Sequence, residues 1–117
     1  MDIELSLIIE SRIYREVISS HLNSSKGIKV ANTYSSSKQA IRTIDQCSTD
    51  IAIIDGSIND VLLLITTIKE VQPLTKIVLI TSSFGMTLPG EYIALGVEGI
   101  ITNSDGVDDL KNCIATV

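Results

Sequence analysis

The chain has 117 residues, of which 44% are hydrophobic, so length and composition predict one domain with a substantial core. Aromatic residues make up only 3% and tryptophan is absent, so the core must be aliphatic. Fourteen acidic residues against nine Lys and Arg residues give a formal net charge of −5, which argues against direct binding of nucleic acid by this domain.

The two cysteines, Cys47 and Cys113, are far apart and form neither a CxxC pair nor a metal-ligand spacing. We interpret both as reduced and packed like small apolar residues. No signal-peptide pattern occurs, and no apolar run approaches the roughly 20 residues that span a bilayer. The sequence therefore predicts a cytoplasmic location and no membrane partner.

The first half of the chain alternates short apolar runs with amphipathic stretches. Residues 3–9 predict a strand, and residues 11–22 predict a helix that Ser11 caps. A turn leads to a second strand at residues 28–31, and residues 35–37 open a second helix. Four apolar side chains of the first helix recur at helical spacing and predict its apolar face: Ile13, Val17, Ile18 and Leu22.

The third and fourth strands are nearly unbroken apolar runs. Residues 50–55 predict a strand that ends on Asp55, and the helix after it, from about residue 60 to 71, ends before Pro73. Residues 76–81 predict the fourth strand. Strands that are apolar throughout are buried on both faces, which favours a parallel sheet.

The last third predicts a short helix, a strand and a closing helix. Because Pro89 can begin a helix but not lie inside one, we expect the fourth helix at about residues 90–95. Residues 98–102 predict the fifth strand, and residues 105–115 the last helix. The inward side chains of that helix should be Val107, Leu110 and Ile114.

Five such βα units predict an α/β fold: a single flavodoxin-like, doubly wound, five-stranded parallel sheet with five helices. We favour the strand order 2-1-3-4-5. No repeat, low-complexity segment or linker interrupts the chain, so residues 1–117 are interpreted as one domain.

Ligands of such sheets bind at the carboxyl ends of the strands, near the point where the strand order reverses. The predicted strand ends bring together the side chains of Glu10, Asp55, Thr81 and Asn103. One interpretation of Asp55 is that it, or Asn59, caps the third helix. The other is a Mg²⁺ site beside a nucleophilic carboxylate, with carboxylates from Glu10 and Asp55 and a carbonyl from Ser57.

Other kinds of site lack their motifs. Neither a GxGxxG turn nor a P-loop follows a strand, and no GxSxG elbow exists. The only histidine, His21, lies well inside the first predicted helix and away from the strand ends. We therefore expect a module that is not an autonomous enzyme.

The order of these segments resembles the CheY-like receiver domains of two-component response regulators, over essentially the whole chain. The segments that carry the resemblance are IIESRIYREVI, TDIAIID, KIVLITSS, ALGVEGIIT and DDLKNCIATV. The Arg15-Glu16 step is similar to the branch with a LuxR-type (NarL/FixJ) DNA-binding domain. The resemblance implies that Asp55 is the phosphoacceptor and Thr81 the switch hydroxyl.

The chain departs from the family at several site positions. The acidic pair aligns with Ile9 and Glu10, so one carboxylate is missing, and the lysine aligns with Asn103. The aromatic switch position is Ile100, and the loop GSINDV after Asp55 lacks the Met-Pro-Gly run and is shorter. Phosphoryl transfer depends on metal and cation neutralisation, so these losses predict an atypical, degenerate receiver with a weak Mg²⁺ site.

We therefore expect a regulatory module that acts mainly without phosphorylation, as a homodimer. Its contact surface would be the first and last helices, or the fourth helix with the fifth strand and the last helix. Residue 117 falls where the last receiver helix ends, which suits a domain cut from a longer chain with a LuxR-type output domain that regulates transcription. Two alternatives remain open: a conventional receiver phosphorylated on Asp55 by a histidine kinase with Mg²⁺, and a flavodoxin-like small-ligand or phosphate-processing domain.

Overall fold

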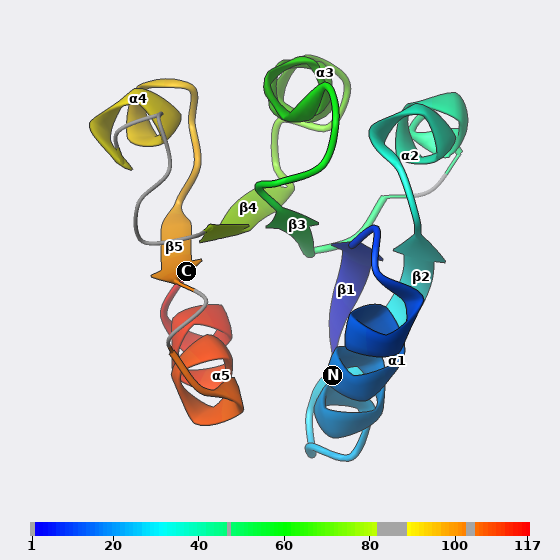
Figure 1. The fold of residues 1–117 in the computed structure, drawn as a ribbon, viewed down its shortest axis with the longest axis vertical. Helices are drawn as coiled ribbons and strands as arrows, with labels where there is room; N and C mark the ends of the chain where they lie inside the picture. The colour runs from blue at the N-terminus through cyan, green and yellow to red at the C-terminus, as the bar shows by residue number, and fades with distance from the viewer. Residues whose placement is uncertain (1, 47, 82–88, 103–104) are drawn as a thin grey trace.

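The computed structural model describes residues 2–46, 48–81, 89–102 and 105–117, and its centre is a five-stranded sheet (Figure 1). The strands are β1 (Ile3–Ile8), β2 (Ile28–Tyr34), β3 (Ile51–Asp55), β4 (Lys76–Thr81) and β5 (Gly99–Thr102). All neighbouring pairs are parallel, in the order β2-β1-β3-β4-β5. The predicted fold class and strand order are confirmed.

Helices cover both faces of this sheet (Figure 1). They are α1 (Arg12–Asn23), α2 (Ser37–Thr43), α3 (Val61–Val71), α4 (Pro89–Ala94) and α5 (Val107–Thr116). Helices α1 and α5 lie on one face, and α2, α3 and α4 lie on the other. No helix in the described ranges is long and apolar enough to cross a bilayer.

Each face of the sheet carries its own aliphatic core, because successive strand residues point to opposite sides. On β3, Ile51 and Ile53 enter the core beneath α1 and α5, whereas Ala52 and Ile54 enter the core beneath α2, α3 and α4. Strand β4 alternates in the same way. This double burial explains why both strands read as continuous apolar runs.

Two expectations from the sequence need correction. Strand β2 continues to Tyr34, three residues beyond the predicted end, because it is an edge strand whose side chains alternate between partly buried and exposed. Helix α1 buries Ile18 and Leu22, but Ile13 and Val17 are 78% and 51% exposed. The predicted apolar face of α1 therefore divides into a core-facing half and a solvent-facing half.

Among the described residues, Cys113 has a free thiol. Its side chain is partly buried and packs against the core beneath α1 and α5. Burial raises the pKa of this thiol. This agrees with the interpretation of a reduced, packed cysteine, whereas Cys47 lies outside the described residues.

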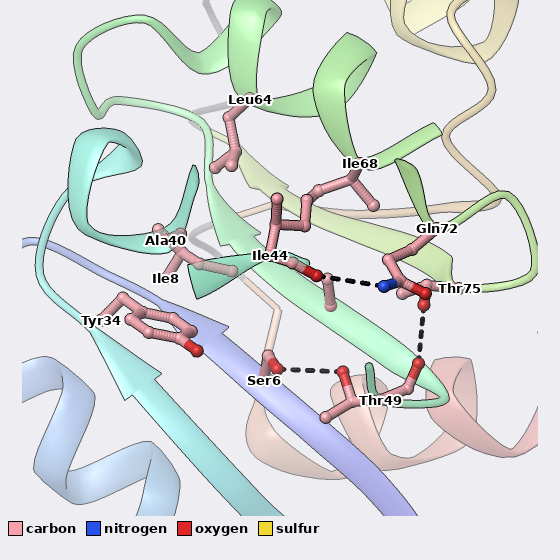
Figure 2. A pocket seen from close by; sticks show the side chains of 11 residues that line it. Ser6, Ile8, Tyr34, Ala40, Ile44, Thr49, Leu64, Ile68, Gln72 and Thr75 are labelled. Atoms are coloured by element: carbon pink, nitrogen blue, oxygen red, sulfur yellow. Dashed lines mark hydrogen bonds between the residues drawn. The ribbon is translucent and has the colours of Figure 1, made fainter. Parts of the chain in front are cut away.

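A small polar cluster lies between the sheet and the helices α2 and α3 (Figure 2). The Ser6 and Thr49 hydroxyls are 2.9 Å apart, and the Thr75 hydroxyl donates to the Thr49 carbonyl at 2.7 Å. The Gln72 amide donates to the Ile44 carbonyl at 3.0 Å. These groups border a cavity of about 30 Å³, room for roughly two water molecules. The cluster joins the chain before β3 to the chain before β4.

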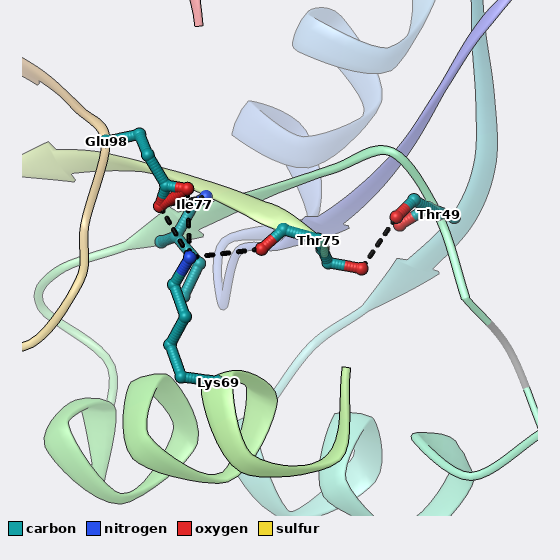
Figure 3. Close-up of polar contacts among 5 residues, drawn as sticks. All are labelled: Thr49, Lys69, Thr75, Ile77 and Glu98. Atoms are coloured by element: carbon teal, nitrogen blue, oxygen red, sulfur yellow. Dashed lines mark hydrogen bonds and ion pairs between the residues drawn. The ribbon is translucent and has the colours of Figure 1, made fainter. Parts of the chain in front are cut away.

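An ion pair ties the end of α3 to the chain entering β5 (Figure 3). The Lys69 ammonium lies 2.7 and 2.9 Å from the two carboxylate oxygens of Glu98, and it also donates to the Thr75 carbonyl. One of those oxygens accepts from the Ile77 amide. Gly96, with φ of +103°, passes close to the Lys69 stem, where a Cβ would stand 3.1 Å from Cε.

Gly99 of β5 lies against α5, and a Cβ placed there would stand 2.5 Å from the Cys113 sulfur. We expect Gly99→Ala to lower the free energy of unfolding by about 1–3 kcal/mol, because α5 must shift to relieve the overlap. Urea unfolding followed by circular dichroism measures this loss. Adding Cys113→Ala should recover most of it, since the overlapping atom is then gone.

The matched control is Gly90→Ala in α4, where a Cβ would meet no atom within 4 Å. Alanine there should be neutral or stabilising by up to about 1 kcal/mol. Equal destabilisation by both substitutions would contradict the packing described for Gly99.

Candidate functional site

Asp55 is the last residue of β3, at the carboxyl edge of the sheet. Within the sheet, β2 is the neighbour of β1 on one flank and β3 is its neighbour on the other flank. The strand order therefore reverses between β1 and β3. Asp55 is half-buried and pairs in register with Ile80 of β4. It therefore lies where folds of this type bind their ligands.

The loop after β3 folds back on the Asp55 side chain. Asp55 Oδ1 accepts hydrogen bonds from the Ser57 amide at 3.0 Å and from the Ser57 hydroxyl at 2.7 Å. The Gly56 amide donates to the Ile80 carbonyl at 2.7 Å, and Ile58 is buried. One carboxylate oxygen is thus held by the chain itself, in a turn anchored to β4.

Asp55 does not cap the third helix. The N-cap of α3 is Asp60, which has φ of +60° and makes no side-chain capping hydrogen bond. The expectation that Asp55 or Asn59 caps this helix is therefore wrong, because the loop runs to Asp60 before the helix begins.

A guanidinium group lies at the end of β1. The Arg15 Nη1 atom donates to the Ile9 carbonyl at 2.6 Å and to the Glu10 carbonyl at 3.2 Å. The Glu10 residue is exposed, whereas the Ile9 side chain is fully buried in the core beneath α1 and α5. The Arg15 guanidinium thus binds the backbone carbonyls of two consecutive residues at the end of β1.

Tyr14 also belongs to this edge of the sheet. Burial, and then the negative charge of Asp55, raises the pKa of the Tyr14 phenol. The sequence pattern did not indicate Tyr14 and Arg15 as site residues. Both lie in the first turn of α1, and their spacing from Glu10 was the signal that could have indicated them.

The remaining predicted site residues lie on β4 and β5. Thr81 ends β4, is half-buried and pairs in register with Thr102. Ile100 pairs with Leu79 and packs, partly buried, against the core beneath α2, α3 and α4. Asn103 lies outside the described residues. Asp55 and Thr81 thus end adjacent strands, while Ile100 belongs to the core at their flank.

The residues proposed for Mg²⁺ are Glu10, Asp55 and Ser57, and they do not fit a strong site. Among the described residues, no cluster of three or more Asp, Glu, His or Cys side chains is arranged to hold a metal ion. One oxygen of Asp55 is engaged by Ser57, and the Arg15 cation is fixed at the end of β1. Since Mg²⁺ needs several oxygen ligands and is repelled by a nearby cation, its binding here should be weak.

The proximity of Tyr14 to Asp55 can be tested by titration. We expect Asp55→Asn to lower the pKa of Tyr14 toward its ordinary value without reaching it, because burial is the larger cause of the shift. NMR of ¹³Cζ-labelled tyrosine, with the Tyr14 signal assigned through Tyr14→Phe, measures this. Asp45→Asn removes an exposed charge from the end of α2 and should leave the Tyr14 titration unchanged. An unaltered Tyr14 pKa in Asp55→Asn would refute the proximity.

No protein-family model and no curated protein sequence matches the chain. Solved structures do resemble it. A two-component response regulator of the LuxR family from Aurantimonas sp. SI85-9A1 superposes with a TM-score of 0.89 at 18% identity, over 98% of this chain and 84% of that one. The isolated REC domain of RcsB from Salmonella enterica serovar Typhimurium gives a TM-score of 0.88 at 21% identity, over 97% and 86%.

The response regulator domain of Thermotoga maritima CheB superposes with a TM-score of 0.81 at 14% identity, over 98% of this chain and 96% of that one. Longer RcsB chains also match: this chain spans 67% of RcsB solved on promoter rprA and 59% of RcsB solved on promoter P1flhDC. The chain therefore has the CheY-like receiver fold, which it shares with these response regulators, as the sequence predicted.

Proposed function

Starting from a receiver fold, we propose that this chain is the signalling receiver domain of a two-component-type response regulator with a degenerate phosphorylation site. It acts as a cytoplasmic regulatory module and not as an autonomous enzyme. It controls an output domain through protein–protein contact or dimerisation. That output domain is of the LuxR type and regulates transcription on the full-length chain, and the RcsB structures solved on promoter DNA support this assignment.

The observation that carries the proposal is the position of Asp55. Its carboxylate stands at the carboxyl end of β3, beside the strand-order reversal, in a fold shared with response-regulator receivers. Thr81 ends the adjacent strand. A nucleophilic carboxylate and a hydroxyl at this edge are the groups that a phosphoaspartate switch uses.

The degeneracy is supported by what surrounds Asp55. Phosphoryl transfer is accelerated by positioning and by neutralisation of the charge on the transferring group. Here the family's lysine position is Asn103, one acid is replaced by the buried Ile9, and Ser57 engages an Asp55 oxygen. Removing one stabilising group of this kind typically slows a reaction about 10²–10³-fold. Phosphorylation of Asp55 should therefore be very slow, whether from a histidine kinase or from a small phosphodonor.

Phosphorylation is tested by treating the chain with acetyl phosphate and MgCl₂ and recording its intact mass over time. We expect no prompt gain of one phosphate. Asn103→Lys should raise the rate roughly 10²-fold by supplying a cation, and adding Asp55→Ala to that variant should abolish the gain.

Prompt phosphorylation of the unmodified chain that is lost in Asp55→Ala would overturn the degenerate site. It would establish the second candidate, a conventional receiver phosphorylated on Asp55 with Mg²⁺, which the presence of both Asp55 and Thr81 favours.

Dimerisation is supported by an exposed apolar surface on α1. Ile13 and Val17 are 78% and 51% exposed, and on α1 they are turned away from the buried Ile18 and Leu22. Helix α4 carries only Ile93 as a comparable exposed residue in the described part of that region. We therefore place the contact between two copies on α1 with its neighbour α5.

Replacing Ile13 and Val17 together by serine should weaken self-association by at least about tenfold, since each side chain loses its apolar burial in the dimer. Sedimentation equilibrium over a concentration series measures the dissociation constant. Ile93→Ser, which removes an equally exposed apolar side chain from α4, is the matched control and should leave it unchanged. The reverse pattern would move the contact to α4, β5 and α5.

A further inference from the structure

A groove of about 510 Å³ runs between α2 and α3, lined by Ser37, Lys38, Ile41, Arg42, Asp60 and Leu63. We propose that this groove, here called the α2–α3 groove, binds an amphipathic helix of a partner protein that carries acidic side chains beside apolar ones. The inference goes beyond the proposed function, which places self-association on α1, on the opposite face of the sheet.

Two of the residues that line the α2–α3 groove are apolar, Ile41 on α2 and Leu63 on α3. Leu63 is 58% exposed. Ile41 is partly buried, and its inner side packs on the core beneath α2, α3 and α4. A partner could therefore bury apolar side chains on a surface already anchored to the core.

The α2 side of the groove carries two cationic side chains. Lys38 and Arg42 are exposed and, being four residues apart on α2, lie on one face of that helix. Neither takes part in an ion pair of the described residues, whose salt bridges are Arg12–Glu16 and Lys69–Glu98. On a chain with a net charge of −5, two unpaired cations beside the exposed Leu63 favour an acidic partner.

The acidic groups near the groove define where a partner's charges fit. The Ser37 hydroxyl donates to the Asn59 carbonyl at 2.7 Å, so the start of α2 is tied to the start of α3. Lys38 and Asp60 therefore share that end, and Arg42 lies one turn further along α2, three residues before the exposed Asp45. A partner carboxylate fits between Lys38 and Arg42, and a partner hydrogen-bond donor fits beside Asp60.

The shape suits a helix. The lining residues of α2 run from Ser37 to Arg42, which at 1.5 Å per residue is about 8 Å and matches between one and two turns of a partner helix. Helix-in-groove recognition uses apolar residues at i, i+3 and i+4, with charged residues at the rim. Leu63 and Ile41 supply the apolar contact, and the two cations supply the rim.

The groove is continuous with the Asp55 loop. The Asn59 carbonyl that Ser37 holds lies two residues after Ser57, which bonds Asp55. A helix bound in the groove would therefore change the environment of the Asp55 turn without touching the carboxylate. This offers a route by which a partner binds and the site responds, with no phosphoryl group involved.

The test is selection of 12-residue peptides from a random phage-displayed library on the purified chain, followed by titration of the enriched peptides into ¹⁵N-labelled protein. We expect peptides that combine Asp or Glu with Leu, Ile or Phe at helical spacing. Their shift changes should centre on α2, on the first turns of α3 and on Gly56 to Ser57. Lys38→Glu with Arg42→Glu, and separately Leu63→Ser, should weaken binding at least tenfold.

Lys26→Glu, introduced into the exposed turn after α1, changes charge in the same direction and should leave affinity unchanged. Thermal unfolding by circular dichroism should confirm that each variant is folded. Enrichment of peptides without acidic residues, shifts centred on α1, insensitivity to the groove variants or failure of the library to enrich would each overturn the proposal. A parallel titration with sodium laurate distinguishes an anionic lipid: groove binding by laurate with no peptide binding would also overturn it.

Discussion

Burial of the central strands on both faces is the constraint on which the rest of this structure depends. Strands β3 and β4 are almost continuously aliphatic, and β1 buries Leu5, Leu7 and Ile8, so all three strands must lie between two layers of helices. Their parallel arrangement then brings all carboxyl ends to one edge of the sheet. Asp55 is partly exposed because the buried part of β3 ends there, and its polarity is tolerated for the same reason.

The Asp55 edge is stabilised by the chain's own polar groups. Ser57 satisfies one carboxylate oxygen, and Arg15 satisfies the carbonyls at the end of β1. These internal hydrogen bonds fix the Asp55 carboxylate and the end of β1, and they support the proposal of a degenerate phosphorylation site. The edge where the strands begin is held by the Lys69–Glu98 ion pair and by the polar cluster of Ser6, Thr49 and Thr75.

The surfaces divide in a way that follows from the same layering. Helix α1 has apolar residues on more than one side, so Ile18 and Leu22 stabilise the fold while Ile13 and Val17 remain exposed. On the other face, the short α2 and the longer α3 leave between them a groove with unpaired cations. A receiver that signals without phosphate needs such surfaces, because binding energy must then supply what the phosphoryl group supplies elsewhere.

The sequence by itself determined the fold class and the strand that ends on Asp55, because apolar runs of strand length and their turn residues are local signals. The strand order was predicted from the topology rules for parallel α/β sheets. The sequence predicted β4 to the residue, and it indicated which family positions are altered. Only the tertiary structure decided that Asp55 accepts hydrogen bonds from Ser57 instead of capping a helix, that Arg15 returns to the end of β1, and that Ile13 and Val17 face solvent. Those outcomes depend on the angle at which each helix packs on the sheet and on the path of one loop, and neither quantity is encoded in periodicity.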